Sequence, residues 1–160
     1  MRGKKLITLG LTPAAFLLLF ASLASGYKLS GYDWTYMTNP MGEDYLVNPN
    51  CADLNGEELN AVKDAAQEWN TTGNADFAFT YGGLDTVSDY RYNSQNDILW
   101  VNRNTGSVAT TYIWTGVGRY RKRIYECDMV FNDRDYTWSI GGNGQVMDVQ
   151  NVATHEFGHF

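Results

Sequence analysis

The two histidines of this 160-residue chain, His155 and His159, stand four residues apart around Glu156 in the segment H-E-F-G-H. H-E-x-x-H on a helix is a zinc-binding motif. The spacing places both imidazoles on one helix face, one turn apart, where their nitrogens can bind a single metal ion. Glu156 lies beside them, and we expect it to remove a proton from metal-activated water. The opposing interpretation is an amphipathic helix with two ordinary histidines.

Two segments have the pattern of amphipathic helices. One begins at Asp148, a good N-cap, and its apolar stripe beneath the histidine face consists of Val149, Val152, Ala153 and Phe157. The other is predicted from Gly56 to about Asn70, with Asn55 as N-cap and Glu58 as its capping-box partner. Its stripe consists of Leu59, Val62, Ala66 and Trp69. Such a stripe indicates a helix that lies on a sheet.

Short segments rich in β-branched and aromatic residues separate the two helices. They predict strands at 45–47, 77–81, 98–102, 108–114 and 124–131. In the last segment Glu126 and Asp128 alternate with Tyr125, Cys127, Met129 and Phe131. This alternation predicts a strand with one buried face and one solvated face.

The N-terminus has the pattern of a secretory signal peptide. Arg2, Lys4 and Lys5 precede a mostly apolar run over 6–23, and small residues follow it. We therefore expect residues 1–26 to be cleaved and the protein to be secreted. The alternative is an uncleaved anchor; after cleavage no membrane span is expected.

The composition is acidic, with a net charge of −6. Removing the three basic residues of the leader leaves 9 Lys and Arg against 18 Asp and Glu, a net charge of −9. Such a chain is not expected to bind nucleic acid, and we interpret the basic cluster Arg119, Arg121, Lys122 and Arg123 as a solvated strand entrance. Residues 27–160 suffice for one domain, which we expect to be monomeric.

Two cysteines follow the predicted leader, Cys51 and Cys127, and no C-x-x-C pair is present. In a secreted protein this number favours a disulfide between them. Two separate buried thiols are the alternative.

The order of elements and several local motifs resemble the metzincin zinc metallopeptidases, in particular their matrixin-like branch. The most specific motif is D-V-Q-N-V-A-T-H-E-F-G-H over 148–159. Supporting motifs are A-A-Q-E-W over 65–69, N-D-I-L-W-V over 96–101 and E-C-D-M-V-F-N over 126–132. The resemblance implies that His155 and His159 bind catalytic Zn²⁺ and that Glu156 is the general base.

The resemblance also implies an α+β fold: a twisted, mostly parallel five-stranded sheet with one antiparallel edge strand, backed by two helices. The edge strand would pair with an extended peptide or protein substrate through Val108, Ala109, Thr110, Thr111 and Tyr112. Structural Ca²⁺ is a further expectation, with oxygen donors in the loops 85–96 and 132–135.

The family pattern continues beyond H-E-x-x-H with a glycine, a third histidine and a methionine turn. Phe160 is the last residue here, so 27–160 correspond to the N-terminal part of such a catalytic domain. Because a catalytic zinc normally has three protein ligands, we expect the 160-residue chain by itself to hold zinc weakly and to be inactive.

Two other interpretations remain open at this level. One is another secreted zinc peptidase with a different third ligand, such as an astacin-like enzyme. The other is a secreted non-catalytic domain that binds glycans on its aromatic rings, since the chain contains 5 Trp and 11 Tyr.

Overall fold

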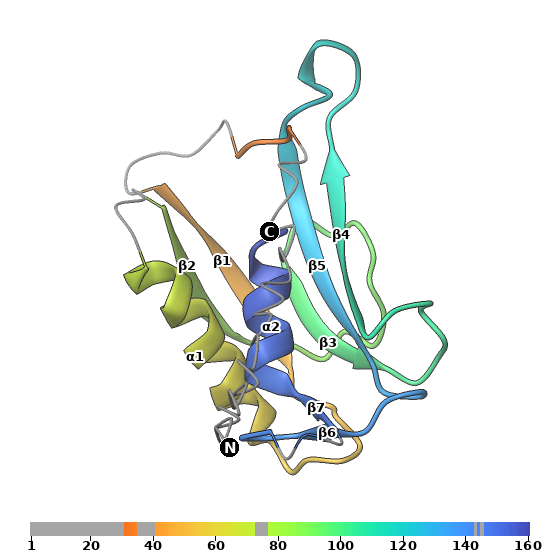
Figure 1. Ribbon diagram of the computed structural model, residues 1–160. Coiled ribbons are helices and arrows are strands. Elements are labelled where there is room, and N and C mark those ends of the chain that lie inside the picture. Colours follow the sequence, from red (N-terminus) through yellow and green to blue (C-terminus); the bar gives the residue numbers. More distant parts are fainter. Residues whose placement is uncertain (1–30, 35–40, 73–76, 143, 145) are drawn as a thin grey trace, which may run out of the picture.

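The computed structural model of the chain describes residues 31–34, 41–72, 77–142, 144 and 146–160. They form a five-stranded sheet in the order β2-β1-β3-β5-β4, with two helices on one of its faces (Figure 1). All strand pairs in this sheet are parallel except β4 with β5. The predicted α+β architecture, a mostly parallel sheet with one antiparallel edge strand and two helices, is therefore confirmed.

The elements follow the predicted order. The strands of the sheet are β1 (Met41–Asn48), β2 (Phe77–Leu84), β3 (Asp97–Val101), β4 (Ala109–Thr115) and β5 (Ile124–Asn132). A separate two-stranded ladder is formed by β6 (Trp138–Ser139) and β7 (Met147–Asp148). The helices are α1 (Glu58–Thr71), α2 (Val149–Phe157) and the short 3₁₀ turn η1 (Gly118–Tyr120).

The predicted signal peptide, residues 1–26, lies outside the described residues. Among the helices of the described part of the chain, none has both the length and the apolar character needed to cross a membrane.

The main core lies between the sheet and its helices. β3 is buried along its whole length, and its Ile98 and Trp100 side chains belong to this core. Their neighbours Leu99 and Val101 join a second, smaller cluster with Val87 and Val130. Because successive side chains of a strand point to opposite faces, the second cluster covers the face of the sheet that bears no helix.

The prediction that β5 has one solvated face is wrong. Glu126 and Asp128 are fully buried, whereas Tyr125, which was expected in the core, is exposed. The physical reason is the β2–β3 loop, whose backbone N–H groups cover these carboxylates. Arg91 N donates to Asp128 Oδ2 at 3.0 Å, and Asn93 N donates to Glu126 Oε2 at 2.9 Å.

The N-terminus of α1 also departs from prediction. The helix is confirmed, but its N-cap is Glu57 and no side chain caps it. Glu58, the expected capping-box partner, is fully buried and accepts a hydrogen bond from Cys51 N at 3.3 Å. A carboxylate that is drawn into this tertiary contact is not available to cap its own helix.

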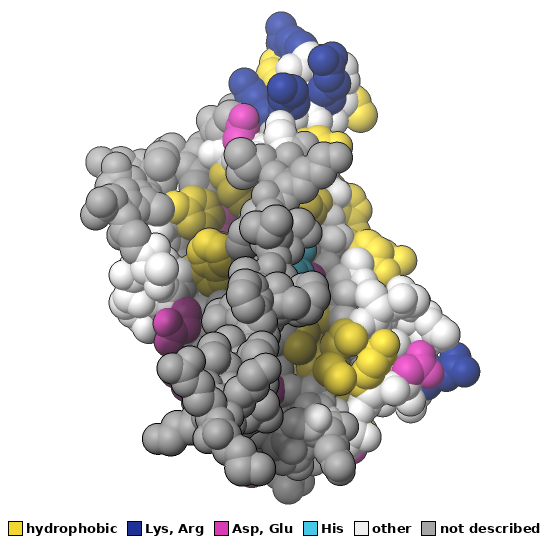
Figure 2. All heavy atoms as spheres, viewed as in Figure 1, with side chains coloured by type: hydrophobic (Ala, Val, Ile, Leu, Met, Phe, Trp, Pro, Cys, Tyr) yellow, Lys and Arg dark blue, Asp and Glu magenta, His cyan; other side chains and the backbone are white. Residues whose placement is uncertain are grey.

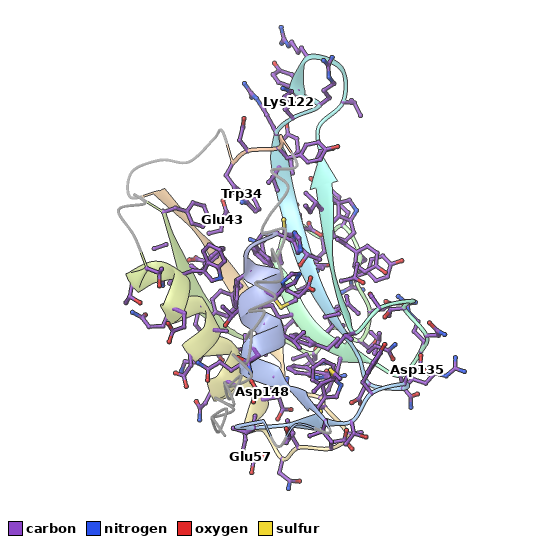
Figure 3. All side chains as sticks on the ribbon, viewed as in Figure 1. Trp34, Glu43, Glu57, Lys122, Asp135 and Asp148 are labelled. Carbon is purple, nitrogen blue, oxygen red and sulfur yellow. The ribbon has the colours of Figure 1, made fainter. Side chains whose placement is uncertain are left out.

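The start of α2 agrees with prediction. Asp148 is the N-cap, and its carboxylate accepts a hydrogen bond from Asn151 N at 2.8 Å. Figure 3 shows Asp148 at the base of this helix. Trp69 of α1 then joins the two helices, since its indole Nε1 donates to Thr154 O at 2.7 Å.

The predicted disulfide between Cys51 and Cys127 is wrong, because both thiols are free and buried. Cys51 Sγ lies 3.6 Å from Asp133 Oδ1, just beyond the end of β5. Cys127 lies on β5, six residues before Asp133. At about 3.3 Å per residue this places it roughly 20 Å away, far beyond the Cα separation of about 7 Å that a disulfide can span.

We therefore expect both thiols to be labelled by iodoacetamide in denaturant without any reductant. Intact mass should show two labels for the parent and one for Cys127→Ser, and dithiothreitol should leave the melting temperature unchanged. A native disulfide would instead block labelling, and its reduction would cost about 2–5 kcal/mol of stability.

Candidate metal centre

The candidate centre lies at the C-terminal end of α2. Val149, Ala153 and Phe157 are buried there, while His155 and His159 are exposed. A helix turns about 100° per residue, so a side chain two positions from Phe157 points roughly 160° away from it. Burial of Phe157 against the sheet therefore turns the histidines outward.

Phe157 is held by other aromatic rings. Its ring centroid lies 4.7 Å from that of Phe79 and 5.3 Å from that of Tyr45. The main chain just beyond it is held as well, because Trp34 Nε1 donates to Phe160 O at 2.7 Å. Figure 3 shows Trp34 above the end of α2. These contacts set the position and rotation of the turn that bears the histidines.

His159 lies one turn beyond His155 but outside α2, which ends at Phe157. The last turn is tightened, since His159 N donates to Glu156 O at 2.9 Å and Gly158 N donates to His155 O at 3.1 Å. Such i→i−3 bonds are common at helix ends. The two imidazoles still converge, with 3.2 Å between their Nε2 atoms.

This separation fits a shared metal ligand set. Two nitrogens at about 2.0–2.1 Å from a tetrahedral ion lie roughly 3.3–3.4 Å apart. The 3.2 Å distance, at which one ring can also hydrogen-bond to the other, is within about 0.2 Å of the value for zinc. His155 and His159 are the residues that could hold the ion.

Glu156 points away from solvent, toward the edge strand. It is 7 % exposed, and Thr111 Oγ1 donates to its Oε2 at 2.8 Å. In the described part of the chain, Glu156 forms no three-residue ligand group with the histidines. The carboxylate of Glu156 is therefore held against the edge strand, and its role as general base stays a prediction.

The edge-strand residues predicted to bind substrate occupy the expected place. Ala109, Thr110, Thr111 and Tyr112 belong to β4, which is the last strand of the sheet order, and Val108 directly precedes it. Their side chains have tertiary partners, as Tyr112 stacks on Tyr90 with 3.7 Å between ring centroids. A peptide would therefore be read by the backbone of this edge, and substrate contact there stays a prediction.

Sequence reasoning missed the role of the Thr111 side chain. It was expected to face substrate, but its hydroxyl holds Glu156 across 45 positions of the chain. No local pattern signals such a bond, because strand pairing and helix packing together decide which hydroxyl meets the carboxylate.

The described residues contain one group of three potential metal-binding side chains, at the opposite end of the sheet: Cys51, Asp53 and Asp133. Burial, reinforced by the Asp133 charge, raises the pKa of the Cys51 thiol to about 12. The thiol is therefore protonated at neutral pH, and its Sγ donates to Asp133 Oδ1 at 3.6 Å within the group. We assign no metal to this group.

Some of the side chains expected to bind calcium have protein partners. Asn132 Oδ1 accepts hydrogen bonds from Arg134 N and Asp135 N, which closes the turn after β5. In the β2–β3 loop, Asn93 Nδ2 donates to Asp97 Oδ2 at 2.8 Å. Calcium binding in these loops stays a prediction.

Buried carboxylates on the outer face of β5 and β3 have shifted pKa values. Burial raises the pKa of Asp128 to about 7, although the N–H groups of Asp97 and Arg91 oppose the shift. Burial raises the pKa of Asp97 to about 6, and the nearby Asp85 reinforces this effect. The pKa of Glu126 is also raised by burial. This face of the sheet therefore keeps protons at pH values where the same carboxyl groups of an unfolded chain are already ionised.

Comparisons with known proteins give no family for this chain. It matches no protein-family model, and no curated protein matches it.

The raised carboxyl pKa values predict that stability falls as pH rises. Folded Asp97 and Asp128 keep their protons up to about pH 6 and 7, whereas the ordinary pKa of an Asp side chain is 3.8. Their contribution is thus complete below about pH 4 and is lost as the pH passes through the folded values. Urea unfolding should give a free energy at least about 1 kcal/mol larger near pH 5 than near pH 8.

The variant Asp97→Asn should weaken this pH dependence, because an amide can donate to Asp85 without ionising. The exposed Asp64→Asn on α1 is the matched control and should leave it unchanged. Stability that rises between these two pH values in the parent chain would contradict the assignment.

A second prediction concerns the bond between Thr111 and Glu156. Thr111→Val keeps the shape of the side chain but leaves a buried carboxylate oxygen without its donor, which costs about 1–3 kcal/mol. Thr111→Ser keeps the hydroxyl and should lose less than half of that. If urea unfolding gives equal losses for both variants, the hydroxyl is not the stabilising group.

Proposed function

We propose that this chain belongs to a secreted zinc-dependent endopeptidase of the metzincin class, nearest to the matrixin-like branch. One observation carries the proposal: two imidazole Nε2 atoms 3.2 Å apart, with a buried carboxylate between them in sequence. The order of elements supports it, because the edge strand lies against the end of the histidine helix. Secretion follows from the leader pattern over residues 1–26.

The proposed chemistry assigns one task to each residue. His155 and His159 would hold zinc, which would supply a Lewis acid for the scissile carbonyl and for water. Glu156 takes the proton of the attacking water and later delivers it to the leaving amine. Thr111 donates to Oε2 of this carboxylate and thereby orients it. No covalent link between protein and substrate is required.

The substrate class follows from the edge strand. β4 pairs with β5 along one side, and no other strand of the described chain pairs along its second side. An extended peptide can add there through main-chain hydrogen bonds. The hydroxyl of Thr111 ties this strand directly to Glu156, so a peptide paired with β4 lies next to the proposed base.

The glycan-binding alternative has less support from the rings. Tyr90 and Tyr112 are parallel and stacked on each other, and Trp100 stacks on Phe131 inside the core. Rings that cover one another in this way offer fewer faces for sugars.

Metal binding by the 160-residue chain is the direct test. After removal of metal by a chelator, isothermal titration with Zn²⁺ should show one site. His155→Ala or His159→Ala should weaken binding more than about 100-fold, beyond the loss caused by removing an outer partner of a ligand. Glu156→Gln should retain zinc, and the exposed Asn151→Ala on α2 is the matched control.

Cleavage of a quenched-fluorescent peptide library by the complete gene product then tests turnover. Glu156→Gln should bind zinc and lose cleavage, because an amide cannot accept the proton. Zinc affinity that survives replacement of both histidines, or cleavage that survives Glu156→Gln, would contradict the proposal.

A further inference from the structure

The hairpin that joins β4 to β5 projects beyond the sheet (Figure 1). The last pair of these two strands is Thr115 with Ile124, and residues 116–123 form the tip. β3 pairs with β5 only from Met129 onward, so the arm continues past its neighbour by about five residues, or roughly 16 Å. In Figure 3, Lys122 lies at this end of the molecule.

The tip concentrates positive charge. Four of the 12 Lys and Arg residues of the chain fall within five positions, at 119, 121, 122 and 123, and they form the basic cluster at the top of Figure 2. Residues 116–123 contain no acid, so the remainder of the chain has 8 basic and 18 acidic residues, a net charge of −10. The molecule is therefore a strongly acidic body with a basic end.

Three of the four basic side chains at the tip face solvent, and Arg123 is half-buried. Arg119, Arg121 and Lys122 are exposed, and the two ion pairs found among the described residues, Arg103 with Asp89 and Arg134 with Asp135, do not involve them. Asp33 pairs with the base of the tip: its N donates to Lys122 O at 2.9 Å and its O accepts from Ile124 N at 2.9 Å. Asp33 thus supports the base of the tip through its main chain.

The tip also has an apolar apex with a defined shape. Val117 is 84 % exposed and stands between Gly116 and Gly118. A side chain at position 116 would clash with Tyr120 O at 2.5 Å, and Gly118 has φ +61°, so both positions require glycine. The Tyr120 ring carries Arg119 and Arg123 at 4.6 and 4.4 Å from its centroid, which holds two guanidinium groups beside the apex.

We propose that this tip, Gly116 to Arg123, docks on an anionic lipid surface. A bare aliphatic residue surrounded by Lys and Arg combines the two contributions to interfacial binding, apolar contact and attraction to acidic headgroups. The acidic body is repelled by the same surface, but charges more than about 8 Å away are screened at physiological salt. Only a basic end that projects from such a body can make the contact.

The apolar apex decides between lipid and other polyanions. A nucleic acid or an acidic polysaccharide would bind the cations without any use for the exposed valine. A lipid interface can bind both, because the valine side chain can enter the apolar region while the basic side chains contact the acidic headgroups. This inference does not depend on zinc or on peptide cleavage.

The test is co-sedimentation of the chain without the predicted leader, residues 27–160, with vesicles of phosphatidylcholine alone or with one third phosphatidylserine. We expect binding to the acidic vesicles only, weakened by added salt. Arg121→Glu with Lys122→Glu should weaken it more than about tenfold, since each cation near such a surface contributes about fivefold. Val117→Asn should weaken it severalfold without any change in charge.

The matched control is Arg91→Glu with Arg134→Glu, which makes the same change in net charge at two exposed positions away from the tip. All variants have the same N-terminus as the parent, so a difference in vesicle binding measures the contribution of the tip. Circular dichroism checks that each variant is folded. Equal binding to neutral and acidic vesicles, or an equal loss of binding in the control, would overturn the proposal. So would the absence of vesicle binding together with retention on heparin that Val117→Asn leaves unchanged.

Discussion

The seating of α2 on the sheet is the constraint on which the candidate site depends. Val149, Ala153 and Phe157 recur every four residues and are buried, so the opposite side of the same helix must face outward. Trp69 and Trp34 add hydrogen bonds to main-chain carbonyls of α2 and of the residue that ends the chain. A rotation of α2 would break the aromatic packing and both bonds at once. This packing therefore sets the direction in which the two histidine side chains point.

The outer face of the sheet has a different chemistry. Instead of helices, the β2–β3 loop covers it and supplies backbone N–H groups to Asp128 and Glu126. Because β5 is the strand that pairs with β4, carboxylates buried beneath β5 help to hold the edge strand that carries Thr111. The proton-binding carboxylates on one face belong to β5, and the threonine that orients Glu156 on the other face belongs to its partner β4.

That pair of strands also continues into the basic hairpin tip. A surface contact at residues 116–123 would fix the direction of β4 and so the orientation of its free edge. The two proposals remain separate, since one rests on imidazole and carboxylate geometry and the other on charge and exposure. Their common element is a strand pair that extends past the rest of the sheet.

Local sequence patterns predicted the element order, the Asp148 N-cap, strands within a few residues and the histidine face of α2, because periodicity and capping act over one or two turns. They failed for the Cys51–Cys127 disulfide, the exposed face of β5 and the cap of α1. Each failure involves partners far apart in the chain, such as Glu126 with the β2–β3 loop. Sequence alone identified His155 and His159 as the candidate metal ligands. Only tertiary packing decided that Thr111 holds Glu156, since sheet pairing and helix docking together bring that hydroxyl to that carboxylate.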